Sequence, residues 1–347
     1  MNEITVKPGF ASPVRHFFVV NPVCFDSRQK MEAVIARVHR YFNNPDHSLQ
    51  SGTSDYAVHV SRFPRDAIGA IRRFADAVPA GVSLRVYAVG GNGTLFDCLN
   101  GVIGLPNVEL GVIPYGNQND FCRAFGKKNW RIFNSLEMQI HAPSVPVDVM
   151  YCGSNYALSH CLIGMEPIAA ASIRKIEEHT FLKRFRQIIS PGMFVNYMCL
   201  IGAMNLNLIR QDYRLWVDGE NFSGVHLLIH ILNSPRFGDS RYYPFIDPTD
   251  GYLDILASGT MGVLKMFKVA NRVLKTLGEL KLDDEGNQEK YSGLVTYRRA
   301  KNISVASEGS LILNLDGELF YDKFVAVEIR PAAVRIIAPN LVTEVHS

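Results

Sequence analysis

The chain has 347 residues, of which 47% are hydrophobic, and its 36 basic and 33 acidic residues give a net charge of +3. A chain of this length favours two domains, and its apolar content is sufficient for packed cores. The near balance of charge argues against a nucleic-acid-binding protein, which usually carries a basic stripe, whereas weak attraction to an anionic membrane surface stays open.

The six cysteines predict reduced thiols in a cytoplasmic protein, because they form no CxxC pair and do not match the spacing of a zinc site. The first residues lack the basic start and apolar run of a signal peptide. The most apolar later stretch, residues 193–209, is interrupted by three asparagines, so we expect no membrane-spanning helix.

Strand and helix patterns alternate through the first third of the chain. Short apolar runs that end at turns predict buried strands, and apolar residues at helical spacing predict helices between them. This alternation predicts a parallel sheet with helices on its faces. The predicted strands cover residues 16–22, 56–63, 84–91 and 109–116, and the predicted helices cover 27–42, 65–78 and 94–103.

The pattern changes near residues 142–147, where two prolines interrupt the sequence and β-type runs begin to dominate. These runs predict a mostly antiparallel β region. Two helical interruptions are expected at 166–189 and 261–280, and "DGE" at 218–220 is interpreted as a hairpin turn. The predicted β runs are 155–164, 205–211, 213–220, 224–233, 251–259, 294–307, 310–320, 324–331 and 333–339.

A glycine-rich loop ends the third predicted strand, where "VGGNGT" places Gly90, Gly91 and Gly93 just before a helix. Glycine permits positive φ and lets backbone N–H groups approach an oxyanion, and a helix N-terminus adds free donors and partial positive charge. Thr94 could cap the helix or contact a phosphate oxygen. The loop matches neither GxGxxG nor the Walker pattern, so a glycine turn without a ligand is the alternative.

A second polar segment, "PYGNQNDF", follows the fourth predicted strand. Pro114 ends the strand, Gly116 allows a tight turn, and residues 117–120 are all polar. Alone, these residues would indicate a surface turn. Because the carboxyl ends of parallel strands meet at one edge of a sheet, we expect this segment beside the glycine loop, where ligands of open α/β sheets bind.

These segments resemble the diacylglycerol kinase catalytic-domain family, which includes bacterial lipid kinases and sphingosine kinases. The family pattern is GGDGTxxExxNG, then PxGTxNDFAR, then DGE. The counterparts here are "GGNGTLFDCLNG" (90–101), "PYGNQNDFCRAFG" (114–126) and "LDGELF" (315–320), with "NPVCF" (21–25) at the family's NPxxG turn. Residues 234–256 also resemble a family segment, and the resemblance is collinear over roughly residues 16–340.

The resemblance implies a fold of type α/β plus β. A Rossmann-like ATP-binding domain would cover residues 12–143 together with a returning C-terminal segment, 327–347. An antiparallel β-sandwich domain for the lipid substrate would cover residues 144–326, and the active site would lie in the cleft between them. Family members use Mg²⁺ and transfer the γ-phosphoryl group of ATP to a lipid hydroxyl.

Site roles follow from the same resemblance. Glu318 would be the general base on the lipid hydroxyl, with a surface hairpin acid as the alternative, and Asp120 would act in catalysis and metal binding. Asp97 would be a further metal ligand. Asp250 and Asp254 resemble a structural Mg²⁺ or Ca²⁺ site, although a DG turn alone explains Asp250. The nucleotide would contact Asn21, Gly90, Gly91, Asn92, Gly93, Thr94, Gly116, Asn117 and Asn119.

The sequence departs from the family pattern at several of these positions. Asn92 replaces the central aspartate of GGDGT, Asn117 replaces a threonine, Asp97 replaces a glutamate, and Cys24-Phe25 displaces a small residue and a glycine. Loss of a carboxylate at residue 92 could weaken metal-dependent transfer without preventing nucleotide binding. A lipid kinase is favoured, a kinase-like protein that binds nucleotide or lipid with little turnover is the alternative, and NAD kinases, which share the GGDGT loop but lack the PxGTxNDFAR-type block, rank third.

The expected partner is a lipid, with no nucleic acid and with a homodimer left open. Residues 168–189 can form a basic amphipathic helix that lies on the inner face of an anionic membrane, or an ordinary helix that covers the β-sandwich. The basic stretch 296–302 is interpreted as a solvated strand end.

Overall fold

The computed structural model describes residues 14–44, 55–116, 119–125, 127–168, 170–171, 211–237, 241–243, 245–259 and 295–339. The chain divides into two compact units, residues 1–149 with 331–347 and residues 150–330. Several predictions fall outside the described residues: Asn117, the helix at 261–280, most of the helix at 166–189, and nearly all of the strand at 205–211.

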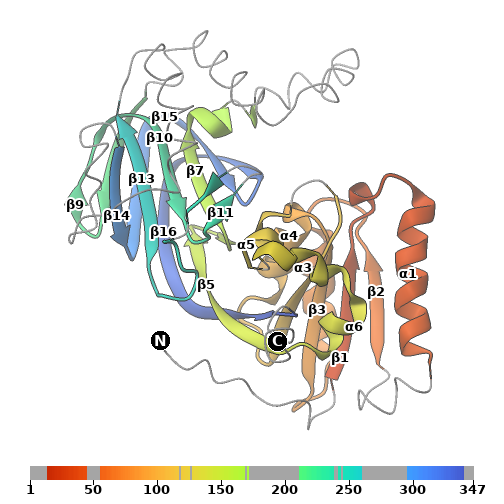
Figure 1. The fold of residues 1–347 in the computed structure, drawn as a ribbon. Helices are drawn as coiled ribbons and strands as arrows, with labels where there is room; N and C mark the ends of the chain where they lie inside the picture. Colours follow the sequence, from red (N-terminus) through yellow and green to blue (C-terminus); the bar gives the residue numbers. More distant parts are fainter. Residues whose placement is uncertain are drawn as a thin grey trace, which may run out of the picture. The chain divides into compact units, whose positions relative to one another are not determined.

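A parallel sheet forms the centre of the first unit, in the order β16-β4-β3-β1-β2 (Figure 1). Its middle strands are apolar on both faces because helices cover both sides. The end of β16 adds the outer strand, where Arg335 pairs with Glu109 of β4 in parallel register. The strands are β1 (Val14–Val20), β2 (Tyr56–Val60), β3 (Ser83–Gly90), β4 (Val108–Pro114) and the last part of β16 (Glu318–Ile337).

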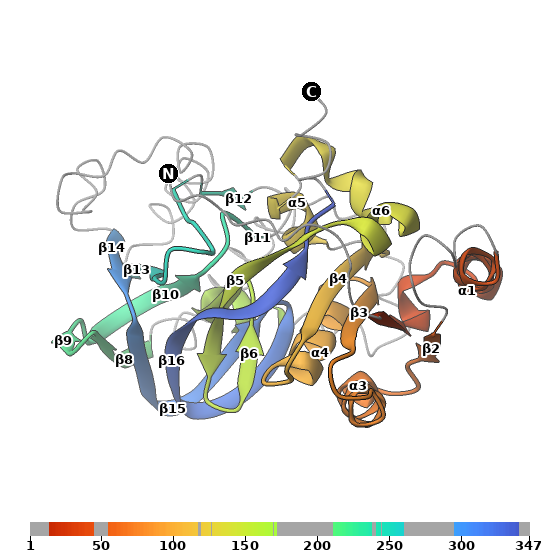
Figure 2. The ribbon, with the colours of Figure 1, turned by 90° about the horizontal axis from the view of Figure 1, so that it is seen from below.

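Helices pack on both faces of this sheet, as the alternating pattern predicted (Figure 2). On one face, α1 buries Val34, Val38 and Phe42 in a core with Phe18, a face that its helical spacing indicated. On the other face, α3 and α4 pack together. The helices are α1 (Arg28–Phe42), α3 (Asp66–Asp76), α4 (Asn92–Val102), α5 (Asp120–Phe125) and α6 (Leu136–His141), with 3₁₀ helices η1 (Pro22–Cys24) and η2 (Lys127–Asn134).

The helical segments after β4 were not predicted from the sequence. Both α5 and α6 have six residues, fewer than two turns, so they show too little periodicity to be recognised. A buried glutamine holds this region in place: the Gln139 side chain donates to the carbonyls of Val112 and Phe133.

The second unit is antiparallel, as predicted, and its strands run in the order β14-β13-β10-β7-β15-β16. Both β10 and β15 pair with β7 over one part of their length and with β8 over another, which curls the strands into a sandwich. The strands are β5 (Ser144–Cys152), which enters the unit, β6 (Asn155–Ala157), β7 (His160–Gly164), β8 (Gln211–Val217), β9 (Glu220–Asn221), β10 (Gly224–Leu232), β11 (Arg236–Phe237), β12 (Arg241–Tyr242), β13 (Leu253–Gly259), β14 (Val295–Ala300) and β15 (Asn302–Leu315).

Two Asp-Gly hairpin turns connect strands in this unit. Asp218 and Gly219 join β8 to β9 with φ of 47° and 86°, which confirms the hairpin predicted at the first "DGE". Asp316 and Gly317 join β15 to β16 with φ of 49° and 97°. Positive φ at both central residues is the requirement of a type I′ turn, and Asp-Gly meets it.

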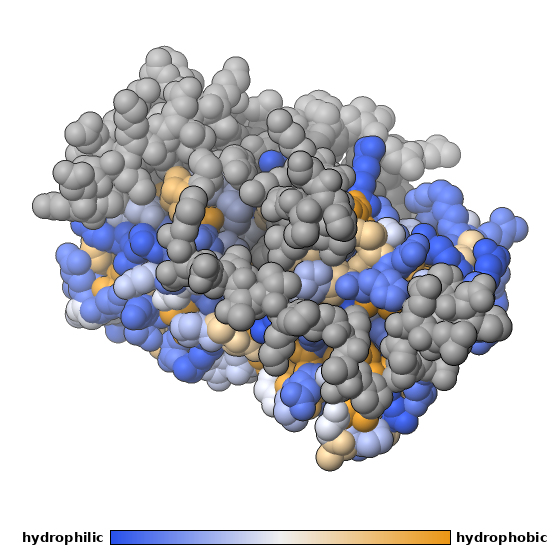
Figure 3. Space-filling model, turned by 60° about the horizontal axis from the view of Figure 1, so that its bottom comes forward, coloured by the Kyte–Doolittle hydropathy of each residue, from blue (hydrophilic) through white to orange (hydrophobic). Residues whose placement is uncertain are grey.

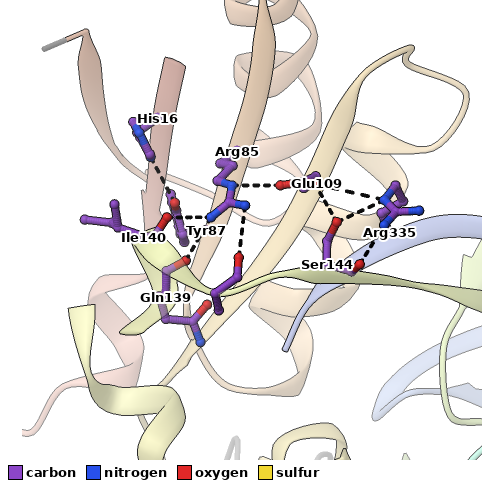
Figure 4. Close-up of polar contacts among 9 residues, drawn as sticks. His16, Arg85, Tyr87, Glu109, Gln139, Ile140, Ser144 and Arg335 are labelled. Atoms are coloured by element: carbon purple, nitrogen blue, oxygen red, sulfur yellow. Dashed lines mark hydrogen bonds and ion pairs between the residues drawn. The ribbon is translucent and has the colours of Figure 1, made fainter. Parts of the chain in front are cut away.

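The buried guanidinium of Arg85 connects strand β3 to the end of α6 and to strand β4 (Figure 4). Arg85 of β3 is 3% exposed and donates to the carbonyls of Gln139, Ile140 and Ala142, at 3.3, 2.5 and 3.0 Å. These carbonyls lie at the end of α6, where the helix offers them no N–H partner. The Arg85 side chain therefore caps α6.

Arg85 also forms an ion pair that connects the strands at the unit boundary. Its Nε lies 2.7 Å from Glu109 Oε2, and Glu109 Oε1 accepts a hydrogen bond from Ser144 Oγ at the start of β5. Arg335 of β16 donates in turn to Ser144. The strand that leaves this unit and the strand that returns to it are thus fixed to the same ion pair, in which Arg85 is buried and Glu109 is partly buried.

Replacing Arg85 with Met should lower the free energy of unfolding by about 3–5 kcal/mol, because Glu109 and the three carbonyls lose their buried partner. Chemical denaturation measures this change. The control is Arg28→Ala, which breaks an exposed pair with Glu32 and should cost less than about 0.5 kcal/mol. Equal losses in the two variants would contradict the assignment of a capping role to Arg85.

Candidate functional site

The glycine loop turns directly from β3 into α4. Gly91 is the N-cap, the helix begins at Asn92, and the first intrahelical bond runs from Leu95 N to Gly91 O. The N–H groups of Asn92, Gly93 and Thr94 precede that bond, so the helix itself offers them no acceptor. Three donors and the positive end of the helix dipole at one strand end make a site suited to an anion.

The structure shows a steric reason for glycine at residue 90, while the close approach of an oxyanion to the loop stays a prediction. None of Gly90, Gly91 and Gly93 has a positive φ. A Cβ on Gly90 would lie 2.2 Å from Thr94 Oγ1, so the glycine makes room for the threonine. Thr94 is not the helix cap, because Gly91 is the N-cap; its side chain is buried at the third helical position and accepts a hydrogen bond from Asn21 Nδ2 at 3.0 Å. The contact of Thr94 with a phosphate stays a prediction.

Cys24 and Phe25, which depart from the family pattern, are accommodated beside the loop. The Gly91 N–H points to Cys24 Sγ at 3.4 Å, and Gly116, with φ of 86°, approaches Cys24 closely. Phe25 packs against Tyr115 with ring centroids 4.7 Å apart. The two departures therefore fill the turn after β1 and leave the start of α4 formed.

The second polar segment joins the glycine loop, as the strand order predicted. Tyr115 N donates to Gly90 O at 3.0 Å, which places the end of β4 next to the end of β3. Asn119 is buried and donates to Gly116 O, and α5 begins at Asp120. Backbone and side-chain hydrogen bonds thus bring the two segments together at the carboxyl edge of the sheet.

A reciprocal pair of hydrogen bonds connects the two loops through side chains. Asn92 Nδ2 donates to Asp120 Oδ2 at 3.0 Å, and Asp120 N donates to Asn92 Oδ1 at 3.1 Å. Asp120 is only 5% exposed. An unpaired carboxylate would be costly at this burial, and the amide provides the donor it needs.

Asp97, the other predicted metal ligand of this unit, is engaged by an arginine. Arg65 donates to its two oxygens, from N at 3.1 Å and from Nη1 at 2.9 Å. Among the described residues no group of three acidic, histidine or cysteine side chains could hold a metal ion. Asp97 and Asp120 therefore do not by themselves form a site that holds Mg²⁺ through protein side chains alone. Their metal roles stay predictions.

In the second unit, the turn before Glu318 is fixed by its aspartate. The Asp316 carboxylate is buried and accepts hydrogen bonds from the N–H groups of Leu158, Ser159 and His160 at 2.6–2.9 Å. Burial raises the pKa of Asp316, and the His160 charge and the three donors oppose that shift. Sequence reasoning assigned no role to Asp316, although the residue belongs to the "LDGELF" motif.

Glu318 itself is half-buried and pairs with Leu315 as the first residue of β16. Its backbone position is therefore set by a two-residue turn that three hydrogen bonds hold to the start of β7. The assignment of Glu318 as a general base stays a prediction.

The predicted structural metal site contains a guanidinium and a phenol as partners of its two acids. Asp250 forms an ion pair with Arg299, and Asp254 accepts a hydrogen bond from Tyr297 Oη at 2.5 Å. Burial raises the pKa of Asp254 to about 7, against the lowering effects of Tyr297 and Arg299. Protein groups thus satisfy carboxylates for which the resemblance implied a cation.

The five described cysteines are free thiols, four of them buried and Cys24 partly exposed. No helix among the described residues has the length and hydrophobicity needed to cross a membrane. On the face in Figure 3, hydrophobic residues form small patches between hydrophilic ones.

A parallel α/β unit with a glycine-rich loop and a helix start at its carboxyl edge, together with an antiparallel β-sandwich, defines the class of protein. The family model "Diacylglycerol kinase catalytic domain" matches residues 15–152, and "YegS C-terminal NAD kinase beta sandwich-like domain" matches residues 195–338. The two models together match most of the chain, which belongs to the diacylglycerol kinase catalytic-domain family, as the motifs indicated.

The chain is also similar to curated relatives and, in its fold, to a solved structure. A candidate lipid kinase of Staphylococcus aureus (strain JH9) is 24% identical over 259 residues, which cover 74% of this chain and 77% of the relative. One of Staphylococcus epidermidis (strain ATCC 35984) is 25% identical over 257 residues, covering 73% and 76%. The crystal structure of a candidate diacylglycerol kinase from Bacillus anthracis (strain Sterne) has a TM-score of 0.65 at 19% identity and covers 93% of this chain and 97% of that chain, which shows the fold.

Asp254→Asn should change how stability depends on pH. Because the folded pKa lies above the ordinary value of 3.8, folded wild-type protein retains a proton that the unfolded chain has lost. Wild-type stability relative to the variant should therefore fall by about 1.4 kcal/mol per pH unit as the pH rises from about 4 to about 7, and then level off.

Urea unfolding at several pH values measures this difference. Asp322→Asn, which alters an exposed acid on β16, is the control and should follow the wild-type profile. A wild-type curve that stays parallel to that of Asp254→Asn across this range would show that Asp254 ionises normally.

Proposed function

We propose that the chain is an ATP-dependent lipid kinase that transfers the γ-phosphoryl group to the hydroxyl of a diacylglycerol-like lipid. The observation that carries the proposal is the start of α4, where three backbone N–H groups lack an intrahelical acceptor at the carboxyl edge of the sheet. A polyphosphate is the ligand that this arrangement favours. The family assignment and the names of the relatives support the same reaction.

In the proposed site the amides of Asn92, Gly93 and Thr94 bind the phosphates of ATP. Phosphoryl transfer depends mainly on positioning and on stabilising negative charge, which fixed amides and a helix N-terminus do without reorganisation. Asn21 keeps Thr94 in place, and Asn92 keeps Asp120 beside the same loop. The Mg²⁺ that the reaction needs is taken as part of the substrate, Mg·ATP.

Glu318 is proposed as the general base. As the lipid oxygen bonds to the γ-phosphorus, the bond between that phosphorus and the β,γ-bridging oxygen breaks, ADP leaves, and the hydroxyl proton moves to the Glu318 carboxylate. The Asp316 turn would act as a positioning element for this carboxylate. The lipid acceptor implies contact with a membrane surface in the cytoplasm.

A second candidate function is a kinase-like protein that binds nucleotide with little turnover. The observation in its favour is the engagement of both predicted metal ligands of the first unit, Asp97 by Arg65 and Asp120 by Asn92. Such a protein would keep the phosphate site and lack metal-assisted transfer.

Glu318→Gln should reduce transfer from γ-³²P-ATP to mixed lipid acceptors by about 10²–10⁴-fold, the usual contribution of a general base. Glu308→Gln, which alters an exposed acid on β15, is the control and should keep wild-type activity. Wild-type protein that binds ATP without labelling any lipid would favour the second candidate function, and equal activity in both variants would exclude Glu318 as the base.

Bound ATP should slow the alkylation of Cys24 by iodoacetamide, because the Cys24 Sγ lies 3.4 Å from the Gly91 N at the proposed phosphate site. Peptide mapping by mass spectrometry follows this cysteine alone. Adenosine, which lacks phosphates, should not protect. Equal labelling rates with and without ATP would contradict a phosphate site at the start of α4.

A further inference from the structure

The contact between Asn92 and Asp120 has a fixed orientation. The Asp120 backbone N–H is a donor only, so it must face the amide oxygen of Asn92, and the amide nitrogen then faces the Asp120 carboxylate. Both hydrogen bonds, at 3.0 and 3.1 Å, are of ordinary length. The amide therefore fits this position in one direction only.

An aspartate at residue 92 would change the electrostatics of this contact completely. Its second oxygen would lie where Asn92 Nδ2 now lies, about 3 Å from Asp120 Oδ2. Two carboxylates this close cannot both stay ionised without a proton or a cation between them. Asp97, a nearby acid on α4, already has Arg65 as a counter-charge.

We propose that the Asn92 amide takes the place of a divalent cation in this site, so that the two loops are assembled without a protein-bound metal ion. Residue 92 is then the position that decides whether the nucleotide-free site takes up a divalent ion. The inference deepens the proposed function, on which its meaning for catalysis rests. For a kinase of this kind, the divalent ion enters with the nucleotide.

Four proteins test the proposal: wild type, Asn92→Asp, Asn92→Ala, and the exchanged variant Asn92→Asp/Asp120→Asn. The exchanged variant restores one amide and one carboxylate with their positions reversed, and the N–H of residue 120 still faces an acceptor. Melting temperature in EDTA and in MgCl₂, and Mn²⁺ binding by electron paramagnetic resonance, are measured without nucleotide. Both readouts are independent of kinase activity, so they can fail separately from the proposed function.

In EDTA, Asn92→Asp should melt about 2–4 °C below wild type because of the repulsion between its carboxylates. Mg²⁺ should restore that loss, and Mn²⁺ should bind at one more site than in wild type. Wild type and the exchanged variant should show neither effect. The proposal is overturned if wild type takes up Mn²⁺ in a way that Asn92→Ala abolishes, or if Asn92→Asp shows no additional Mn²⁺ site.

Discussion

The reciprocal hydrogen bonds between Asn92 and Asp120 are the contact on which the arrangement of the candidate site depends. Helices α4 and α5 each begin at a loop that follows one of two neighbouring parallel strands. Short-range contacts hold these two loops in position relative to each other. A neutral amide can serve a backbone donor and a carboxylate at the same time. The geometry of the amides proposed to bind phosphate therefore does not require a metal ion.

The Asp-Gly turn occurs twice in the second unit and has a different role at each place. Asp218 and Asp316 each occupy the first central position of a type I′ turn, and each accepts hydrogen bonds from backbone N–H groups in another part of the sheet. Asp218 is exposed and connects the turn between β8 and β9 to the start of β15. Asp316 is buried and fixes the start of the strand that carries Glu318. The role of this turn motif thus depends on whether its aspartate is exposed or buried.

All four carboxylates that motifs mark as metal ligands have protein partners. Asn92 pairs with Asp120. Arg65 pairs with Asp97, Arg299 with Asp250, and Tyr297 with Asp254. The partners of the last two lie more than 40 residues away in sequence, and β13 and β14 bring them together by antiparallel pairing. No spacing rule applied to the acids alone could have identified these partners.

The sequence by itself determined the two-part architecture, the meeting of the two loops at the sheet edge and the family. Hydrophobic periodicity and motif residues can be recognised within short stretches of the chain. It did not reveal the short helices after β4, the Arg85 cap or the role of Gly90, which is to leave space for the Thr94 side chain. Only the tertiary structure decided which donor faces each buried acid, because burial and pairing depend on segments that folding brings together from distant parts of the chain.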